Sequence, residues 1–107
     1  MSNFNLHDLE QRLQQRAQES AEVSYTRKLL DRGVAYCAKK MGEEAFETAI
    51  AAVSEDDKRL TNEAADLIYH LLVVLHARGI TLADVEATLA GRTQQSGLDE
   101  KASRKHG

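Results

Sequence analysis

Two pairs of acidic residues stand at helical spacing in the middle of the 107-residue chain. Glu44 and Glu47 form the first pair, and Glu63 and Asp66 form the second. Residues three positions apart on a helix are neighbours at about 5–6 Å between Cβ atoms, so each pair shares one helix face. Like charges at that spacing repel each other, which favours a compensating cation. Carboxylate oxygens are the ligands that Mg²⁺ and Mn²⁺ prefer, so the pattern indicates a metal site between two helices.

The plainer interpretation is that these acids are solvated helix residues, which is the usual situation for a single pair. Two pairs on consecutive predicted helices make the two interpretations about equally strong. Lys39 and Lys40 lie one turn before Glu43 and Glu44. Lys40 either forms an ordinary helix ion pair with Glu44, or lies beside a metal site where it meets a phosphate oxygen.

The composition predicts a single all-α domain. Proline is absent, aromatic residues make up 5%, and helix-favouring residues dominate a chain that is 42% hydrophobic. We expect an antiparallel bundle of about four to five helices that dimerises through helix packing. The helices are expected over residues 6–18, 34–53, 57–78 and 81–92, with a short capped segment over 24–33.

Several classes of partner are disfavoured by the sequence. The net charge of −3 gives no basic field for a nucleic-acid backbone. The longest purely apolar run, Leu71 to Leu75, is far shorter than the roughly 20 residues of a membrane span, so we expect no membrane and a cytoplasmic protein. The single cysteine, Cys37, excludes a disulfide within the chain and is expected to be a buried thiol.

Helical periodicity predicts which faces are buried. The expected core positions are Ala38, Ala45, Ala49, Ile50 and Val53 on the second long pattern, Leu60, Ala64, Leu67, Leu71 and Val74 on the third, and Leu82, Val85 and Leu89 on the last. Glu63 and Asp66 fall at the edge of the third stripe, which favours an enclosed acidic site. His70 follows Asp66 by one turn, and we favour a hydrogen-bonded structural histidine over a site residue.

The segment Ser24-Tyr25-Thr26 combines hydroxyl groups with a predicted helix start. We favour a helix-capped connector there, because serine is a common N-cap residue. The alternative is contact with a phosphate or sugar, since hydroxyls at a helix start suit an anion. Residues 94–107 are polar and lack an apolar period, and their composition alone predicts a disordered tail after a domain over residues 1–93.

The acidic motif also matches a known family. Glu43, Glu44, Glu47, Glu63 and Asp66 fit the pattern EExxE followed by ExxD, which is shared by the MazG-like all-α nucleotide pyrophosphohydrolases. Narrower matches are Ser24-Tyr25-Thr26 with Leu29-Leu30, Lys39-Lys40, the run from Asp66 to Leu72, Arg92-Thr93, Ser96-Gly97-Leu98 and the run from Glu100 to Arg104. The sequence therefore resembles the phosphoribosyl-ATP pyrophosphohydrolases over nearly its whole length. It departs from the family pattern at Val23, Phe46 and Gln94, which concerns loop geometry and not the chemistry.

The resemblance implies Mg²⁺-dependent hydrolysis of 1-(5-phosphoribosyl)-ATP to the corresponding AMP derivative and pyrophosphate, the second step of histidine biosynthesis. It implies a homodimer, possible substitution of Mn²⁺ for Mg²⁺, and a tail that substrate orders. The implied metal ligands are Glu44, Glu47, Glu63 and Asp66; the implied catalytic residues are Glu43 and Glu47; the implied substrate-binding residues are Tyr25, Lys39, Lys40, Lys101 and Arg104.

Two alternatives remain open at this stage. The first is a related house-cleaning enzyme that acts on canonical or damaged nucleotides, which would not need the segment from Ser96 to Arg104 in this form. The second is a helical interaction module with merely solvated acids, which would show no dependence on Mg²⁺.

Overall fold

The computed structural model describes residues 3–92, and these residues form five α-helices and no strand. The all-α prediction is confirmed. The helices are α1 (Leu6–Ala17), α2 (Tyr25–Asp31), α3 (Val34–Ser54), α4 (Asp57–Ala77) and α5 (Leu82–Arg92). Each lies within two residues of its predicted bounds. The predicted tail, with Lys101 and Arg104, lies outside the described residues.

Polar side chains fix where the helices begin. Asn5 and Asp8 form a reciprocal capping box at the start of α1, in which each side chain accepts a hydrogen bond from the other residue's backbone N–H. Ser24 caps α2 and Asp56 caps α4 by a single hydrogen bond each. In both cases the side chain accepts from the backbone N–H three residues later. The capped connector predicted at Ser24 is confirmed.

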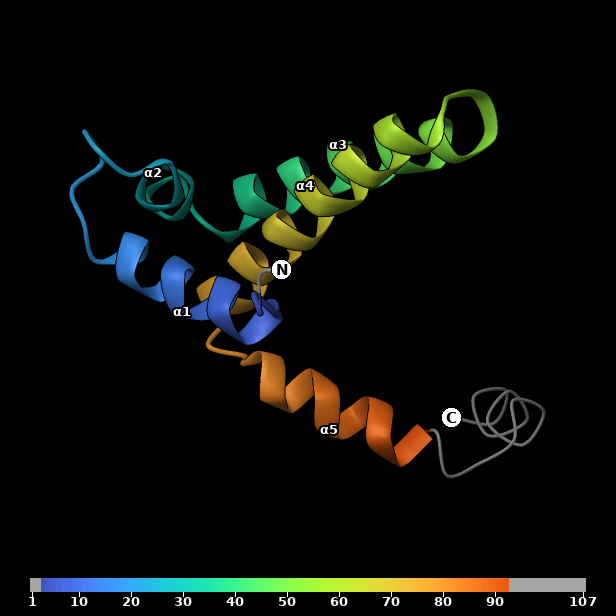
Figure 1. Cartoon of the computed structure of the whole chain (residues 1–107). Coiled ribbons are helices and arrows are strands. Elements are labelled where there is room, and N and C mark those ends of the chain that lie inside the picture. The colour runs from blue at the N-terminus through green and yellow to red at the C-terminus, as the bar shows by residue number, and fades with distance from the viewer. Residues whose placement is uncertain (1–2, 93–107) are drawn as a thin grey trace.

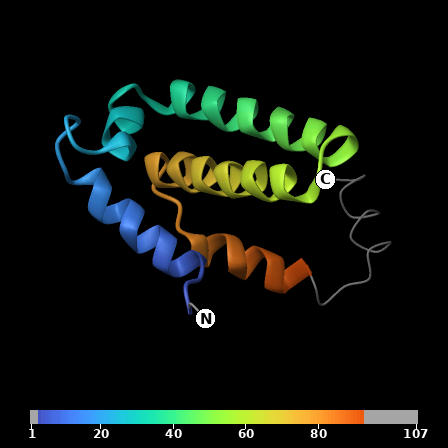
Figure 2. The same ribbon diagram turned by 45° about the horizontal axis from the view of Figure 1, so that its top comes forward.

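The two long helices, α3 and α4, run antiparallel as a hairpin, and α1 and α2 pack at the end of the hairpin away from its turn (Figure 1, Figure 2). The core lies at that end and is formed by Leu13, Leu29, Cys37, Leu72, Val73 and Leu82. Cys37 is a free buried thiol, as expected. The start of α5 is held to α1, because the Glu10 carboxylate accepts a 2.7 Å hydrogen bond from the backbone N–H of Leu82.

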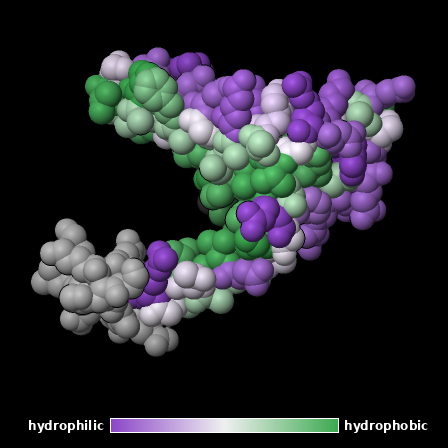
Figure 3. Space-filling model, turned by 180° about the vertical axis from the view of Figure 1, so that it is seen from behind, coloured by the Kyte–Doolittle hydropathy of each residue, from purple (hydrophilic) through white to green (hydrophobic). Residues whose placement is uncertain are grey.

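Part of the predicted core is exposed in this chain. Val53 is 85% exposed, Leu89 52%, Ile50 42% and Leu71 40%, and Ala45 and Ala49 are also exposed. These predictions are wrong for the single chain because no other described helix covers the outer half of the hairpin. Figure 3 shows a deep notch between that half and α5, with hydrophobic residues on both of its walls. Periodicity identifies an apolar face but not whether the same chain covers it.

Among the described residues, no single helix is both long enough and apolar enough to cross a membrane. Only α4 and α5 taken as a pair pass by length and composition, and they are bent by 106° at their junction.

Candidate metal centre

Three of the predicted acidic residues converge between α3 and α4. Glu44 from α3 and Glu63 and Asp66 from α4 each offer a carboxylate oxygen, and these three oxygens lie within 4.8 Å of one another. The antiparallel hairpin produces this arrangement because it brings the middle of α3 against the first half of α4. The convergence expected from the two acid pairs is therefore present in the structure for these three residues.

The cluster contains carboxylate oxygens that the described residues leave unsatisfied. Oε2 of Glu44 and Oε2 of Glu63 are buried and have no hydrogen-bond partner there. Glu63 as a whole is only 7% exposed, and its other oxygen contacts the guanidinium of Arg59 at 3.3 Å. Unpaired buried polar atoms are costly, and orphaned carboxylate oxygens in particular suit a cation.

The pKa values of the cluster also indicate that its negative charge is unfavourable. Burial, followed by repulsion from Glu47, Asp66 and Glu63, raises the pKa of Glu44 from 4.5 to about 7. The pKa of Glu63 is also raised, first by the nearby Glu47 carboxyl group and then by burial. Carboxylates held this close together favour a compensating positive charge.

Glu47 lies beside this cluster without completing it. Its carboxyl group interacts with those of Glu44 and Glu63, but its oxygens do not fall within the set that lies within 4.8 Å. Its side chain is exposed. The structure thus brings Glu47 to the site, and its role as a fourth ligand stays a prediction.

The residues fit a hard divalent cation. Oxygen-only donors at one side of a helix pair are typical of Mg²⁺, which keeps several water ligands and needs only a few carboxylates from the protein. The orphaned oxygens of Glu44 and Glu63 provide unused acceptors that such an ion would occupy.

The lysines that precede the acidic cluster do not form the ion pair between Lys40 and Glu44 that ordinary helix spacing predicts. Lys40 pairs with Glu43 at 3.5 Å and not with Glu44. Glu43 is the main reason that the pKa of Lys40 is raised. Both groups lie on the turn of α3 that precedes the acidic cluster, while Lys39 is exposed on the same turn. Neither the substrate role of the lysines nor the catalytic role of Glu43 is tested by this arrangement.

An aromatic cluster adjoins the metal centre, and periodicity did not identify it. The rings of Tyr25 and Tyr69 stack with centroids 6.4 Å apart, and His70 presents an edge to both rings. The Tyr69 hydroxyl is 2.6 Å from Oγ1 of Thr26, which ties α4 to α2. Since His70 and Asp66 are neighbours along α4, the cluster borders the acids.

Within the part of the chain that the structure describes, the hydrogen bond expected for a structural His70 is not made by one of its two ring nitrogens. His70 is 6% exposed, and its Nδ1 atom has no hydrogen-bond partner among the described residues. Burial lowers the pKa of His70, and Lys40 lowers it further. The i, i+4 spacing from Asp66 places His70 beside the acids, as the sequence indicated, but it does not show which hydrogen bonds the ring makes.

The repulsion within the cluster predicts a pH-dependent stability. The pKa of Glu44 is higher in the folded protein, so the folded state binds more protons than the unfolded state between pH 4.5 and about 7. Stability contributed by this group therefore falls as the pH rises through that window. We expect Glu44→Gln to leave the Tm of the metal-free protein nearly unchanged at pH 4.5 and to raise it increasingly toward pH 7.

The pH dependence of the Tm must be compared between wild type and Glu44→Gln, because His70 changes the stability of wild type in the opposite direction. Its lowered pKa makes stability rise with pH below about 6.5, the ordinary pKa of histidine. Thermal unfolding of both proteins in EDTA at pH 4.5, 5.5, 6.5 and 7.5 removes the His70 contribution by subtraction. A Tm difference that stays constant across this range would contradict the origin given for the pKa of Glu44.

Known proteins resemble this chain over nearly its whole length. Residues 6–93 match the family described as phosphoribosyl-ATP pyrophosphohydrolase. Phosphoribosyl-ATP pyrophosphatase 1 of Bradyrhizobium diazoefficiens is 59% identical, over 98% of this chain and 99% of that protein. The phosphoribosyl-ATP pyrophosphatase of Nitrobacter winogradskyi is 57% identical, over 97% and 90%. Phosphoribosyl-ATP pyrophosphatase 1 of Rhodopseudomonas palustris is 55% identical, over 98% of each.

Proposed function

The chain belongs to the phosphoribosyl-ATP pyrophosphohydrolase family, and from this membership we propose that it hydrolyses 1-(5-phosphoribosyl)-ATP. The products are 1-(5-phosphoribosyl)-AMP and pyrophosphate, and the reaction is a step of histidine biosynthesis. The observation that carries the proposal to particular residues is the convergence of Glu44, Glu63 and Asp66, with buried oxygens that lack partners.

We propose Mg²⁺ as the cofactor, with Mn²⁺ as a possible substitute. Glu44, Glu63 and Asp66 would hold the ion, and Glu47 would complete the set from the next turn of α3. When bound, Mg²⁺ neutralises charge on the pyrophosphate leaving group and acidifies a coordinated water. Carboxylates from two packed helices hold such a site more precisely than loop residues would.

The remaining residues have roles that follow from their charge and place. Lys40 would exchange its exposed ion pair with Glu43 for a phosphate oxygen, at little cost because exposed pairs contribute about 0–1 kcal/mol. Lys39 lies on the same turn and offers a second cation to the phosphates. Glu43, released from Lys40, would orient the attacking water.

Tyr25 would contact the substrate beside the metal centre. It is 54% exposed although it stacks on Tyr69 and meets the edge of His70, so one face of its ring stays accessible. Aromatic faces of this kind bind sugars and bases by stacking. Lys101 and Arg104, which lie outside the described residues, keep their expected role at the phosphates.

We also propose that the protein is a homodimer. The exposed apolar residues Phe46, Ile50 and Val53 recur along one face of α3, and Ile68 and Leu71 add exposed apolar surface on α4. Contiguous exposed apolar surface of this kind marks association sites. Helix packing between two copies would cover the half of the α3–α4 hairpin that one chain leaves bare (Figure 3).

The proposed function predicts selective, metal-dependent release of pyrophosphate. We expect release from phosphoribosyl-ATP in Mg²⁺, loss of that release in EDTA, and little release from ATP or from a panel of dNTPs. The measurement is a coupled pyrophosphate assay on all substrates at equal concentration. Preference for dNTPs would keep the metal site and assign a house-cleaning activity, whereas release from no substrate would leave a helical interaction module.

A further inference from the structure

A groove of about 440 Å³ lies between α1 and α2, next to the aromatic cluster. We call it the arginine groove. Its described lining comprises Leu9, Arg12, Leu13, Arg16, Val23, Ser24, Tyr25, Thr26 and Tyr69. Its volume is within the usual range of small-molecule sites. Of its lining residues, only Tyr25 has a role in the proposed function.

The charge in the arginine groove is one-sided. Arg12 and Arg16 stand at i, i+4 on α1, where like charges repel by a few tenths of a kcal/mol, and none of the described residues that line the groove is acidic. Arginine presents a planar fork of donors that matches a phosphate group. Two such forks on one wall therefore suit a ligand that carries a phosphate.

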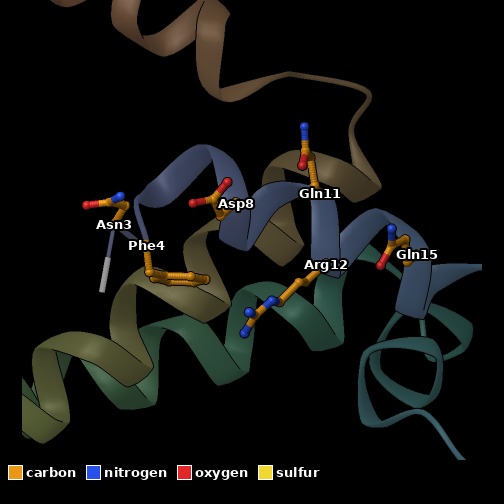
Figure 4. A pocket seen from close by; sticks show the side chains of 6 residues that line it. All are labelled: Asn3, Phe4, Asp8, Gln11, Arg12 and Gln15. Carbon is orange, nitrogen blue, oxygen red and sulfur yellow. The ribbon is translucent and has the colours of Figure 1, made fainter. Parts of the chain in front are cut away.

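Both arginines have partners that they could exchange. The Arg12 guanidinium lies 4.8 Å from the centre of the Phe4 ring, toward which its side chain extends from α1 (Figure 4). Arg16 contacts the carboxylate of Glu19 at 3.4 Å, with 59% of the Arg16 side chain exposed. Exposed cation–π and ion-pair contacts are each worth up to about 1 kcal/mol, less than a hydrogen bond between charged groups.

The opposite wall connects the groove to the metal centre. Tyr69 lines the groove and follows Asp66 by three residues on α4, so the two side chains are neighbours on one helix face. Tyr25 lines the groove as well and touches both Tyr69 and His70. A molecule whose triphosphate lay at the acids could therefore extend past these rings toward the arginines.

We propose that the arginine groove binds the 5-phosphate of the substrate's phosphoribosyl group through Arg12 and Arg16, with Tyr25 and Tyr69 beside the sugar. This inference rests on the proposed function. It assigns opposite ends of the substrate to different chemistry: the triphosphate to the carboxylate-held metal, and the monoester to the guanidinium pair. Selection of phosphoribosyl-ATP over ATP follows, because ATP has no group that reaches the arginines.

The first test compares two substrates and two proteins. For wild type, removal of the 5-phosphate to give 1-ribosyl-ATP should lower kcat/KM about 100-fold, about tenfold for each lost charged hydrogen bond. The double variant Arg12→Gln, Arg16→Gln should lose the same factor on phosphoribosyl-ATP, mainly through KM, and lose almost nothing further on ribosyl-ATP. Arg78→Gln, an exposed arginine at the end of α4, is the matched control.

Two kinetic results would overturn the assignment. Equal losses on both substrates would show that the arginines act on the triphosphate or on the fold. No loss on phosphoribosyl-ATP would show that they do not contact substrate.

A second test measures binding of a sugar phosphate to the wild-type protein, without a variant and without hydrolysis. Ribose 5-phosphate added to the wild-type protein in EDTA should shift the backbone amide signals of Arg16 and Ser24 to Thr26 in a ¹H–¹⁵N spectrum, and ribose should not. Shifts confined to α5, or no shifts, would contradict the subsite. If phosphoribosyl-ATP is not hydrolysed, the proposed function fails, and this titration still decides whether the groove binds a sugar phosphate.

Discussion

Glu44→Gln is expected to lower pyrophosphate release about 10³-fold, the effect of losing roughly 4 kcal/mol of charge stabilisation in the transition state. The same change should make the metal-free protein more stable at pH 7.5. The reason is that burial of the Glu44 carboxylate, together with repulsion from three other acids, raises its pKa to about 7. Glutamine keeps the shape of the side chain and removes the charge that both effects depend on.

The two outcomes are measured separately. Pyrophosphate release is followed in saturating Mg²⁺, and Tm is measured in EDTA and in Mg²⁺ at pH 7.5. Wild type should gain Tm on adding Mg²⁺, because an ion that binds only the folded state stabilises it. Glu44→Gln should gain much less.

Glu22→Gln is the matched control, because it removes an acid of the same type from the exposed turn between α1 and α2. It should leave pyrophosphate release, the Tm in EDTA and the Tm in Mg²⁺ unchanged. Full activity in Glu44→Gln would exclude Glu44 from the metal centre. A fall in the Tm of its metal-free form would instead show that the cluster is not electrostatically strained.

A variant that is more stable yet inactive would be typical of a functional site. The α3–α4 hairpin gathers carboxylates where an apolar or neutral pair would fold more easily, and the proposed cation would offset that cost. The same repulsion between carboxylates at i, i+3 is what led us to predict a cation at this place from the sequence.

Local features of the fold were predictable because local chemistry sets them. The starts of α1, α2 and α4 follow from Asn5, Ser24 and Asp56, whose side chains each accept a hydrogen bond from the backbone N–H three residues later. Spacing of acids at i, i+3 correctly predicted that Glu44, Glu63 and Asp66 meet, because an antiparallel helix hairpin has few ways to pair its faces.

The rest depended either on which of two nearby partners a side chain chooses in the folded protein or on contacts between distant segments. Lys40 could reach either Glu43 or Glu44, and rotamer choice in the folded chain favoured Glu43. Tyr25 and Tyr69 are far apart in the sequence, and only the packing of α2 on α4 brings their rings together. Arg12 and Arg16 line a groove only because α2 packs beside α1 and supplies its other wall.

The largest error concerned burial on α3. Its apolar stripe was predicted to face the core, yet Val53 is 85% exposed and Ile50 42%. The physical reason is that Cys37 and Ala51 use the buried face of α3, and small residues there allow α4 to approach closely. The bulky stripe is left exposed in the single chain, and the proposed second copy would cover it.

Val53→Asp is therefore expected to break the proposed homodimer. An aspartate buried without a partner costs about 3–5 kcal/mol, and its short side chain cannot carry the charge to water, so dimer affinity should fall at least about 10²-fold. The change occurs twice in a symmetric dimer, which adds to the effect. Light scattering after size-exclusion chromatography should show wild type at twice the monomer mass and the variant as a monomer.

Ala52→Asp provides the matched control, because it places the same charge on the adjacent residue of α3. Both changes add a carboxylate near the C-terminal end of the helix, where the helix dipole disfavours it equally. Position 52 is exposed but lies off the stripe of Phe46, Ile50 and Val53. If both variants stay dimeric, the stripe is not the interface. If both become monomeric, the helix end rather than the stripe controls assembly. Only a difference between two neighbouring positions shows that the face left bare by one chain is the face that two chains share.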